Sequence, residues 1–328
     1  MPRELTLIVT DLHLAPDSAS LESPPLEALE LVLARAGSRE ASDWREWVCS
    51  AAGFQRALAV APVSRCADQL PRAGQWWLAN PVHLEAGLDH VRLAHELMLA
   101  PDEWLELESG IRGVLDPVLG FEGSSGANAY LLAQRELEAG TFDPARAVGN
   151  DVHAFLPSGA DSSLLIRVMT ELQMWLHSHP LNLRREQRGL LPVNGFWIWG
   201  GGALPEQGAA RVRDVELPAL FSDDAFATGL WRLANGAPGA LPGELDRTAI
   251  VRAPSSIVAV TLRQRAGDSD GERMRVLEQA WIAPALALLR RGDITRLRLH
   301  LNNSLFTVTP LDLLRLWRRR RSWLETAG

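Results

Sequence analysis

The chain has 328 residues, of which 47% are apolar and 22% are charged, and its formal net charge is −7. This balance is ordinary for a packed globular protein of one large domain or two medium ones. Every basic residue is arginine, because the sequence contains no lysine. Schiff-base chemistry, a phosphate-loop lysine and a catalytic amine are therefore excluded.

Two cysteines, Cys49 and Cys66, are present, without a CxxC pair or a metal-type spacing. We expect two buried or inert thiols in a reducing compartment rather than a disulfide framework. No apolar run approaches the ~18 residues that span a bilayer, and the N-terminus is too short and too acidic for a signal peptide. The sequence predicts a soluble cytoplasmic protein with no membrane partner.

The first half of the chain begins with a short, β-branched apolar run at 5–10, which predicts a buried strand. Helices are predicted at 25–36 and 43–52, each followed by a glycine stop. The pattern changes near Gln75. From there the predicted elements are strands at 75–79 and 90–94, a helix at 101–119, strands at 129–133 and 152–156, and a helix at 161–177.

The second half begins with a strand at 193–199 that runs into Gly200-Gly201-Gly202. A helix is predicted at 222–235, with Ser222 as its N-cap. The remaining predictions are a strand at 256–263, a helix at 272–291, a hairpin of 295–301 with 304–309, and a last helix from Pro310 into Arg318-Arg319-Arg320-Arg321.

The stretch from Leu172 to Gly202 carries the most informative polar residues. Gln173 and His177 lie four residues apart on one shoulder of the predicted helix, where a polar pair could face a cleft. His179 and Asn182 follow in the turn that Pro180 imposes. Two histidines two positions apart point in different directions on a helix, so the helix dipole at its C-terminus explains them better than a metal site.

The glycines that end the 193–199 strand could let a backbone approach a phosphate. However, Ala203-Leu204-Pro205 follows them with no helix start, so they match neither a dinucleotide fingerprint nor a phosphate loop. A tight bend is the alternative. The run Gly123-Ser124-Ser125-Gly126 is predicted as a flexible loop, and without a GxSxG motif a Ser-His-Asp hydrolase is not predicted.

The same stretch resembles the proteobacterial RpfE-type regulatory proteins, which are relatives of cofactor-independent phosphoglycerate mutase in the alkaline phosphatase superfamily. The segment Trp77–Leu84 and the ending Leu316-Trp317-Arg318-Arg319 also resemble that family. Within 171–202 the resemblance is carried by Glu171, Gln173, His177, His179-Pro180-x-Asn182, Arg185, Gly189, Pro192, Asn194 and Trp197-x-Trp199-Gly200-Gly201-Gly202.

The resemblance implies an α/β fold with two lobes. Residues 1–70 and 193–328 would form a mixed-sheet core of the alkaline-phosphatase type, and 71–192 an inserted α+β lobe. It also implies two divalent metals, such as manganese, with Asp11 as a candidate first ligand. A two-metal site needs several Asp and His ligands and a nucleophile, yet the sequence reads His300-Leu301-Asn302-Asn303 where an Asp-His pair would be expected. We therefore predict a catalytically degenerate relative without a cofactor, with an active metal-dependent mutase or phosphatase as the alternative.

Two binding sites are predicted. In the first, Arg185 would clamp a small anion, while Asn182, Asn194 and the three glycines would orient it. The alternative for these residues is a structural polar network. In the second, Arg318–Arg321 could bind a protein partner or an acidic surface, although arginines at the end of a helix are commonly a solvated cap. The acidic balance of the chain argues against a nucleic-acid partner.

Overall fold

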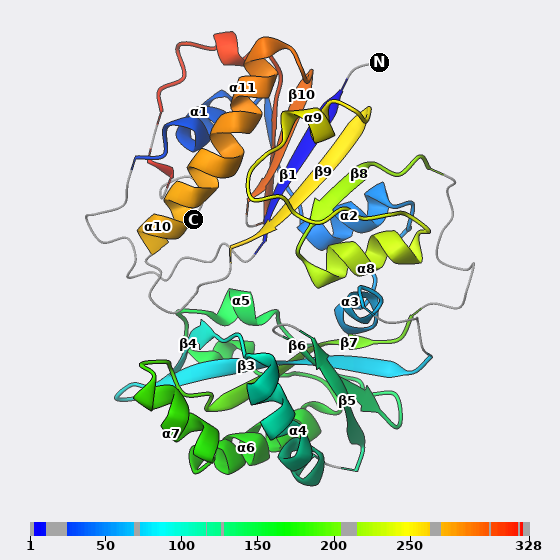
Figure 1. Cartoon of the computed structure of the whole chain (residues 1–328), viewed down its shortest axis with the longest axis vertical. Helices are drawn as coiled ribbons and strands as arrows, with labels where there is room; N and C mark the ends of the chain where they lie inside the picture. Colours follow the sequence, from blue (N-terminus) through cyan, green and yellow to red (C-terminus); the bar gives the residue numbers. More distant parts are fainter. Residues whose placement is uncertain are drawn as a thin grey trace.

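A computed structural model of the chain describes residues 3–10, 25–68, 73–115, 117–125, 128–204, 215–262, 270–301, 303–320 and 322–323. Two β-sheets, one above the other in Figure 1, organise these residues. The fold is therefore mixed α/β, as the sequence predicts. No helix among the described residues is long and apolar enough to cross a membrane.

The first sheet has six strands in the order β2-β11-β10-β1-β9-β8. Strand β1 (Glu4–Thr10) lies inside it, in parallel register with β10 on one side and β9 on the other. The neighbouring strands are β2 (Ser38–Ala41), β8 (Ala219–Ser222), β9 (Ser255–Thr261), β10 (Arg296–Leu301) and β11 (Ser304–Val308). Because β8, β9, β1 and β10 are parallel, their carboxyl ends share one edge.

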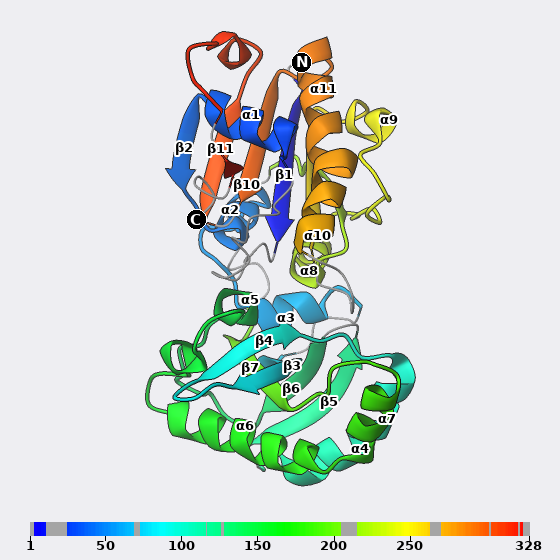
Figure 2. The same ribbon diagram turned by 90° about the vertical axis from the view of Figure 1, so that its left-hand side faces the viewer.

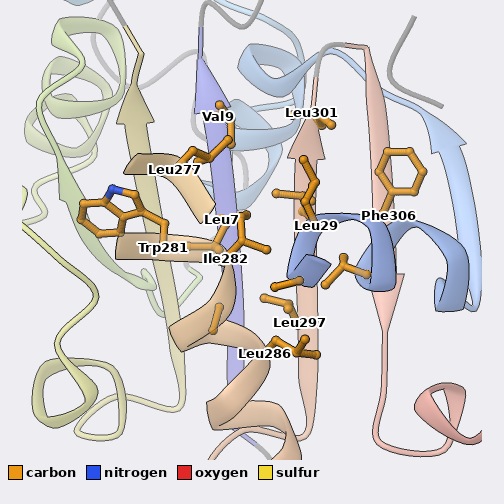
Figure 3. Packing of buried hydrophobic residues seen from close by; sticks show 14 of the residues in the cluster. Leu7, Val9, Leu29, Leu277, Trp281, Ile282, Leu286, Leu297, Leu301 and Phe306 are labelled. Carbon is orange, nitrogen blue, oxygen red and sulfur yellow. The ribbon is translucent and has the colours of Figure 1, made fainter. Parts of the chain in front are cut away.

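Two helical layers cover this sheet. On one face Leu5, Leu7 and Val9 of β1 pack against helices α1, α10 and α11, and Figure 3 shows Leu7 beside Leu29 and Ile282 in that interior. On the other face Ile8 packs against α2 and α8, as the alternation of side chains along a strand requires. The helices are α1 (Glu27–Arg35), α2 (Trp44–Ala51), α8 (Ala225–Leu233), α10 (Asp270–Leu277) and α11 (Ala283–Arg291), with the short α9 (Arg247–Ile250) beside them.

The α10–α11 helix contains a π-helical segment, Glu278–Ile282. Pro284 follows it and has no N–H to donate to the carbonyl four residues earlier. That carbonyl, on Ala280, accepts the Leu245 N–H at 2.9 Å instead. The Glu278 carboxylate meanwhile accepts the N–H groups of Ala28 and Leu29 at the start of α1, whose own N-cap residue makes no side-chain hydrogen bond.

The second sheet is antiparallel, with the order β4-β3-β6-β5 and with β7 also paired to β3. Its strands are β3 (Gln75–Ala86), β4 (Val91–Glu96), β5 (Leu119–Ser125), β6 (Asn128–Ala133) and β7 (Gly195–Gly202). Helices α4 (Pro101–Val114), α6 (Ser162–His177) and α7 (Pro180–Gln187) cover the face turned away from the first sheet (Figure 2).

Helix α3 (Val60–Arg65) lies between the two sheets and, with α5 (Pro144–Ala147), on the near face of the second sheet (Figures 1 and 2). It packs against α8 on one side and against β3 and β7 on the other. The approach to α8 is so close that a Cβ atom on Gly229 would lie 1.9 Å from the Val63 carbonyl oxygen. Glycine at 229 therefore allows the two helix backbones to touch.

Several sequence predictions differ from the structure. The helix predicted at 101–119 ends at Val114, and Leu119 begins β5. Residues Val152–Phe155 form a 3₁₀ turn rather than a strand, because the Asp151 side chain accepts the His153 N–H and starts a turn. Within the described residues 310–320, the segment after Pro310 forms a 3₁₀ turn, Asp312–Leu314, instead of a long helix. The Asp312 carboxylate there accepts both the N–H and the hydroxyl of Thr309.

Another difference concerns a strand. Residues 123–125, expected in a flexible loop, belong to β5 and pair with β6. The strand predicted at 193–199 is β7, and it pairs with β3 in the second sheet. The division of the chain into lobes stays a prediction.

The contact between Glu278 and α1 yields a stability prediction. Glu278→Ala removes the acceptor for two helix N–H groups and a negative charge from a helix N-terminus, so we expect the free energy of unfolding to fall by about 1 kcal/mol. Urea unfolding followed by circular dichroism measures the loss. Glu278→Gln keeps one acceptor oxygen and should lose less; equal stability of all three proteins would contradict the capping role.

Candidate functional site

The first sheet offers one place where an α/β fold commonly binds a ligand. After β8 the chain turns to α8 on one face of the sheet, and after β9 it reaches α10 on the opposite face. Adjacent parallel strands whose connections leave on opposite faces open a crevice at their carboxyl ends. The candidate functional site is therefore the edge beyond β8 and β9, which faces the second sheet (Figure 1).

The polar side chains of this edge hold the local backbone. The Asp223 Oδ1 accepts the Thr261 N–H at 3.2 Å, and the Asp224 Oδ1 accepts the Ala227 N–H at 2.8 Å as the N-cap of α8. The Ser222 hydroxyl accepts the Asp224 N–H at 2.9 Å. The predicted serine cap of α8 is thus replaced by an aspartate. Neither aspartate was predicted from the sequence; the Ser-Asp-Asp run before a helix was the signal that could have identified them.

One hydroxyl at this edge has no hydrogen-bond partner among the residues that the structure describes. It is the buried Thr261 Oγ1. The neighbouring Thr10 donates its hydroxyl to the Val260 carbonyl oxygen at 3.3 Å. Asp11, the candidate metal ligand, lies outside the described residues. Within the described part of the chain, Thr261 is thus the hydroxyl at this edge that a ligand could bond.

His300 lies near the carboxyl end of β10 and is fully buried. Neither ring nitrogen has a hydrogen-bond partner among the described residues, and the ring lies 5.1 Å from that of Trp47, centroid to centroid. Burial lowers the pKa of His300 to about 4, with Asp43 opposing the shift and Arg298 adding to it. The imidazole is therefore neutral near pH 7 and is enclosed by protein.

The described residues at this edge do not form the two-metal centre that the resemblance implies. Among residues 3–10, 25–68 and the other described ranges, no group of three or more His, Cys, Asp or Glu side chains could hold a metal ion. Asp223 and Asp224 already bind backbone N–H groups, and His300 is enclosed. These side chains stabilise the fold and are not gathered around a cation site.

Arg185, the predicted anion clamp, is paired inside the protein. One guanidinium nitrogen donates to both carboxylate oxygens of Glu103 at 2.8 Å, and the Arg185 Nε donates to the Leu191 carbonyl oxygen at 2.8 Å. Glu103 also accepts the Ala100 N–H at the start of α4. Both charged side chains are 5% exposed. The charge of Arg185 is therefore neutralised by its partner.

The two predicted asparagines bind backbone groups. The Asn182 amide donates to the Leu176 and Val193 carbonyl oxygens, both at 2.9 Å, and accepts the Val193 N–H at 2.8 Å. The Asn194 side chain accepts the Leu84 N–H at 2.7 Å and donates to the Leu84 carbonyl oxygen at 2.8 Å. Asn182 thereby ties α6 to the entry of β7, and Asn194 extends the pairing of β7 with β3.

The predicted helical pair and the nearby histidine lie at the surface of the second lobe. Gln173 and His177 are exposed on α6. His179 caps α7 by accepting the Leu181 N–H on its Nδ1, and its ring packs edge-on against Trp175 at 4.7 Å. Burial lowers the pKa of His179, while Glu106 opposes this shift. Pro180 thus ends one helix and begins the next, since proline fits the first position of a helix.

The glycines at the end of β7 allow close packing. Gly200 has a φ of +68°, and its N–H donates to the Thr141 hydroxyl at 3.1 Å. A Cβ atom at 201 would lie 2.3 Å from the Trp77 ring, and one at 202 would lie 2.5 Å from Ala59, just before α3. These glycines and Asn194 occupy opposite ends of β7. The structure therefore does not gather the predicted anion-binding residues into one site.

The sequence similarity of the chain to known proteins is local. No protein-family profile matches the chain. The chain is 30% identical over 107 residues to a 2,3-bisphosphoglycerate-independent phosphoglycerate mutase from Methanothrix thermoacetophila, covering 33% of this chain and 27% of that protein. It is 36% identical over 87 residues to a second such mutase from Methanothermobacter thermautotrophicus, covering 26% and 22%. Each match thus spans about a quarter of the curated relative.

Among solved structures, the chain is similar to a cofactor-independent phosphoglycerate mutase from Thermoplasma acidophilum, with a TM-score of 0.44 and 15% identity over 100% of this chain and 95% of that one. A protein from Pyrococcus horikoshii gives a TM-score of 0.44 and 12% identity over 94% and 87%. The local sequence matches indicate a phosphoglycerate mutase-like family. The RpfE-type subfamily stays a prediction.

The enclosed His300 predicts a pH-dependent stability. Its pKa of about 4 in the folded chain lies below the ordinary value of 6.5, so the unfolded chain binds the proton more readily. Its contribution is complete above pH 6.5 and is lost as the pH falls toward 4, by up to about 3 kcal/mol. Urea unfolding of wild type and His300→Leu at pH 7.5 and 4.5 measures it: the variant should lose less stability on acidification. An equal loss would contradict the enclosed site.

Removing one member of the Arg185–Glu103 pair should destabilise the protein more than removing both. Arg185→Met alone leaves a buried unpaired carboxylate, so we expect a loss of about 3–5 kcal/mol in the free energy of unfolding. The double variant Arg185→Met/Glu103→Leu should recover part of that loss. Added inorganic phosphate should leave the unfolding midpoint of the wild type unchanged. If phosphate raises the unfolding midpoint of the wild type and Arg185→Met abolishes that rise, Arg185 binds an anion as first predicted.

Proposed function

We propose that this chain is a phosphoglycerate mutase-like protein of the RpfE type. It has lost two-metal phosphoryl transfer and acts in regulation by binding a partner. The proposal rests on the described polar groups at the sheet edge, which are bonded or enclosed within the protein. Asp223 and Asp224 hold backbone N–H groups, and His300 is enclosed beneath Trp47. Two-metal catalysis needs carboxylates and imidazoles free to bind the ions and orient the displacement.

The fold supports the proposed lineage, with a different boundary for the inserted lobe. We propose an alkaline-phosphatase-like core built on the first sheet, with the α+β lobe of the second sheet inserted into it. Because β7 pairs with β3, the inserted lobe extends from residue 71 to Gly202 rather than to 192. The core then consists of residues 1–70 and 203–328. Helix α3 packs against α8 of this core and against β3 and β7 of the inserted lobe.

The alternative is an active metal-dependent phosphoglycerate mutase or phosphatase. Two observations favour it. Asp11 follows Thr10, whose strand ends at the candidate edge, and the mutases that match the chain carry the name of an active enzyme. In that case Asp11 would hold a divalent ion such as manganese together with donors outside the described residues.

A metal and turnover measurement separates these candidates. The purified chain, incubated with manganese, is assayed for bound metal, for interconversion of the phosphoglycerates and for phosphate release from a generic phosphomonoester. We expect no stoichiometric manganese and no turnover above background. Asp11→Ala should behave as the wild type. Manganese-dependent turnover that Asp11→Ala abolishes would instead establish the active enzyme.

A further inference from the structure

The segment after β11 exposes an unusual concentration of apolar side chains. Leu311, Leu314, Leu316 and Trp317 are 77%, 66%, 76% and 76% exposed. Exposed leucines occur singly on most proteins, whereas several together mark an interaction surface. We call these four side chains, together with Arg315, Arg318, Arg319 and Arg320, the apical patch.

The apical patch belongs to an anchored segment. The Asp312 carboxylate binds Thr309 and pairs with Arg315 at 2.9 Å on the N-terminal side. Arg318 donates to the Ala36 carbonyl oxygen at 2.7 Å, at the C-terminal end of α1, and Trp323 is buried in the core of the first lobe. Figures 1 and 2 place the segment at the end of the molecule opposite the second sheet. The exposure is thus a property of the folded chain.

Tight turns hold the apolar side chains of the patch. The Leu314 N–H donates to the Leu311 carbonyl oxygen, and the Arg318 N–H to that of Arg315, at 3.2 and 3.1 Å. A bond between residues three apart brings side chains at that spacing onto one side, which places Leu311 and Leu314 together, and Leu316 and Trp317 follow within the second turn. Because these backbone groups are bonded within the turns, the patch offers side chains rather than a strand edge.

The charge around the apolar side chains of the patch is positive although the whole chain carries −7. Arg315 and Arg318 already contact Asp312 and Ala36, and Arg320 lies 3.7 Å from the exposed Glu27 carboxylate. Arg319 is exposed. Arg321 continues the run in sequence and lies outside the described residues. A negative partner would therefore meet this end of the molecule in preference to the rest of it.

We propose that the apical patch docks on an anionic phospholipid surface. Tryptophan and leucine on a projecting turn fit the boundary between headgroups and acyl chains, and arginine side chains can reach the phosphates while their stems stay apolar. An acidic protein would match the charge but would have to supply pockets for all four apolar side chains. The expectation of no membrane partner rested on the lack of a spanning segment, which a peripheral surface does not require. The inference is independent of the proposed loss of catalysis.

Vesicle co-sedimentation tests the proposal. The full chain is mixed with vesicles of phosphatidylglycerol and phosphatidylcholine in equal parts, or of phosphatidylcholine alone. We expect binding at least about tenfold tighter to the anionic vesicles, weakened by added salt. Trp317→Ser and Arg319→Glu should each weaken it about tenfold or more. Leu88→Ser is the matched control, because Leu88 is a fully exposed leucine in the second lobe.

Unfolding midpoints equal to that of the wild type would show that the Trp317 and Arg319 variants are folded. The lipid proposal is overturned by the absence of vesicle binding, by equal binding to neutral vesicles, or by an equal loss in Leu88→Ser. A protein partner that binds the chain through Trp317 while anionic vesicles do not would also overturn it and assign the patch to a protein interface.

Discussion

A polar group removed from water must find a hydrogen bond inside the protein, and this constraint decides the role of most polar residues in this structure. Asn182 and Asn194 supply bonds to backbone groups next to β7, and Glu103 satisfies both Arg185 and the start of α4. At the edge of the first sheet Asp224 caps α8. The same chemical types that could hold an anion or a cation are here required by the fold.

The constraint also explains where sequence reasoning succeeded. The β-branched run at 5–10 is buried on both faces of the first sheet. Its burial could therefore be predicted from apolar content alone. The helix expected at 161–177 starts and ends within a residue of the observed α6, because its apolar period is regular. Pro101 marked the start of α4 correctly, since a first-turn proline loses no hydrogen bond.

Sequence reasoning failed where a distant partner decides the outcome. The Asn182 amide can bind a ligand or a carbonyl, and only the return of the chain at Val193 places those carbonyls beside it. Gly201 could approach a phosphate or an indole, and Trp77 is 124 positions away along the printed sequence. The pairing of β7 with β3 was likewise hidden, because an apolar strand fits either sheet. Local pattern therefore predicted the elements better than the site.

The π-helical segment before Pro284 couples three parts of the chain that are remote in sequence. Glu278 in that segment contacts the start of α1, and Pro284, which lacks an N–H, leaves the Ala280 carbonyl to the loop at Leu245. Both contacts depend on this irregular part of the helix. This segment thus joins the first helix, the loop before α9 and the last long helix. These three parts should therefore lose their order as one cooperative unit.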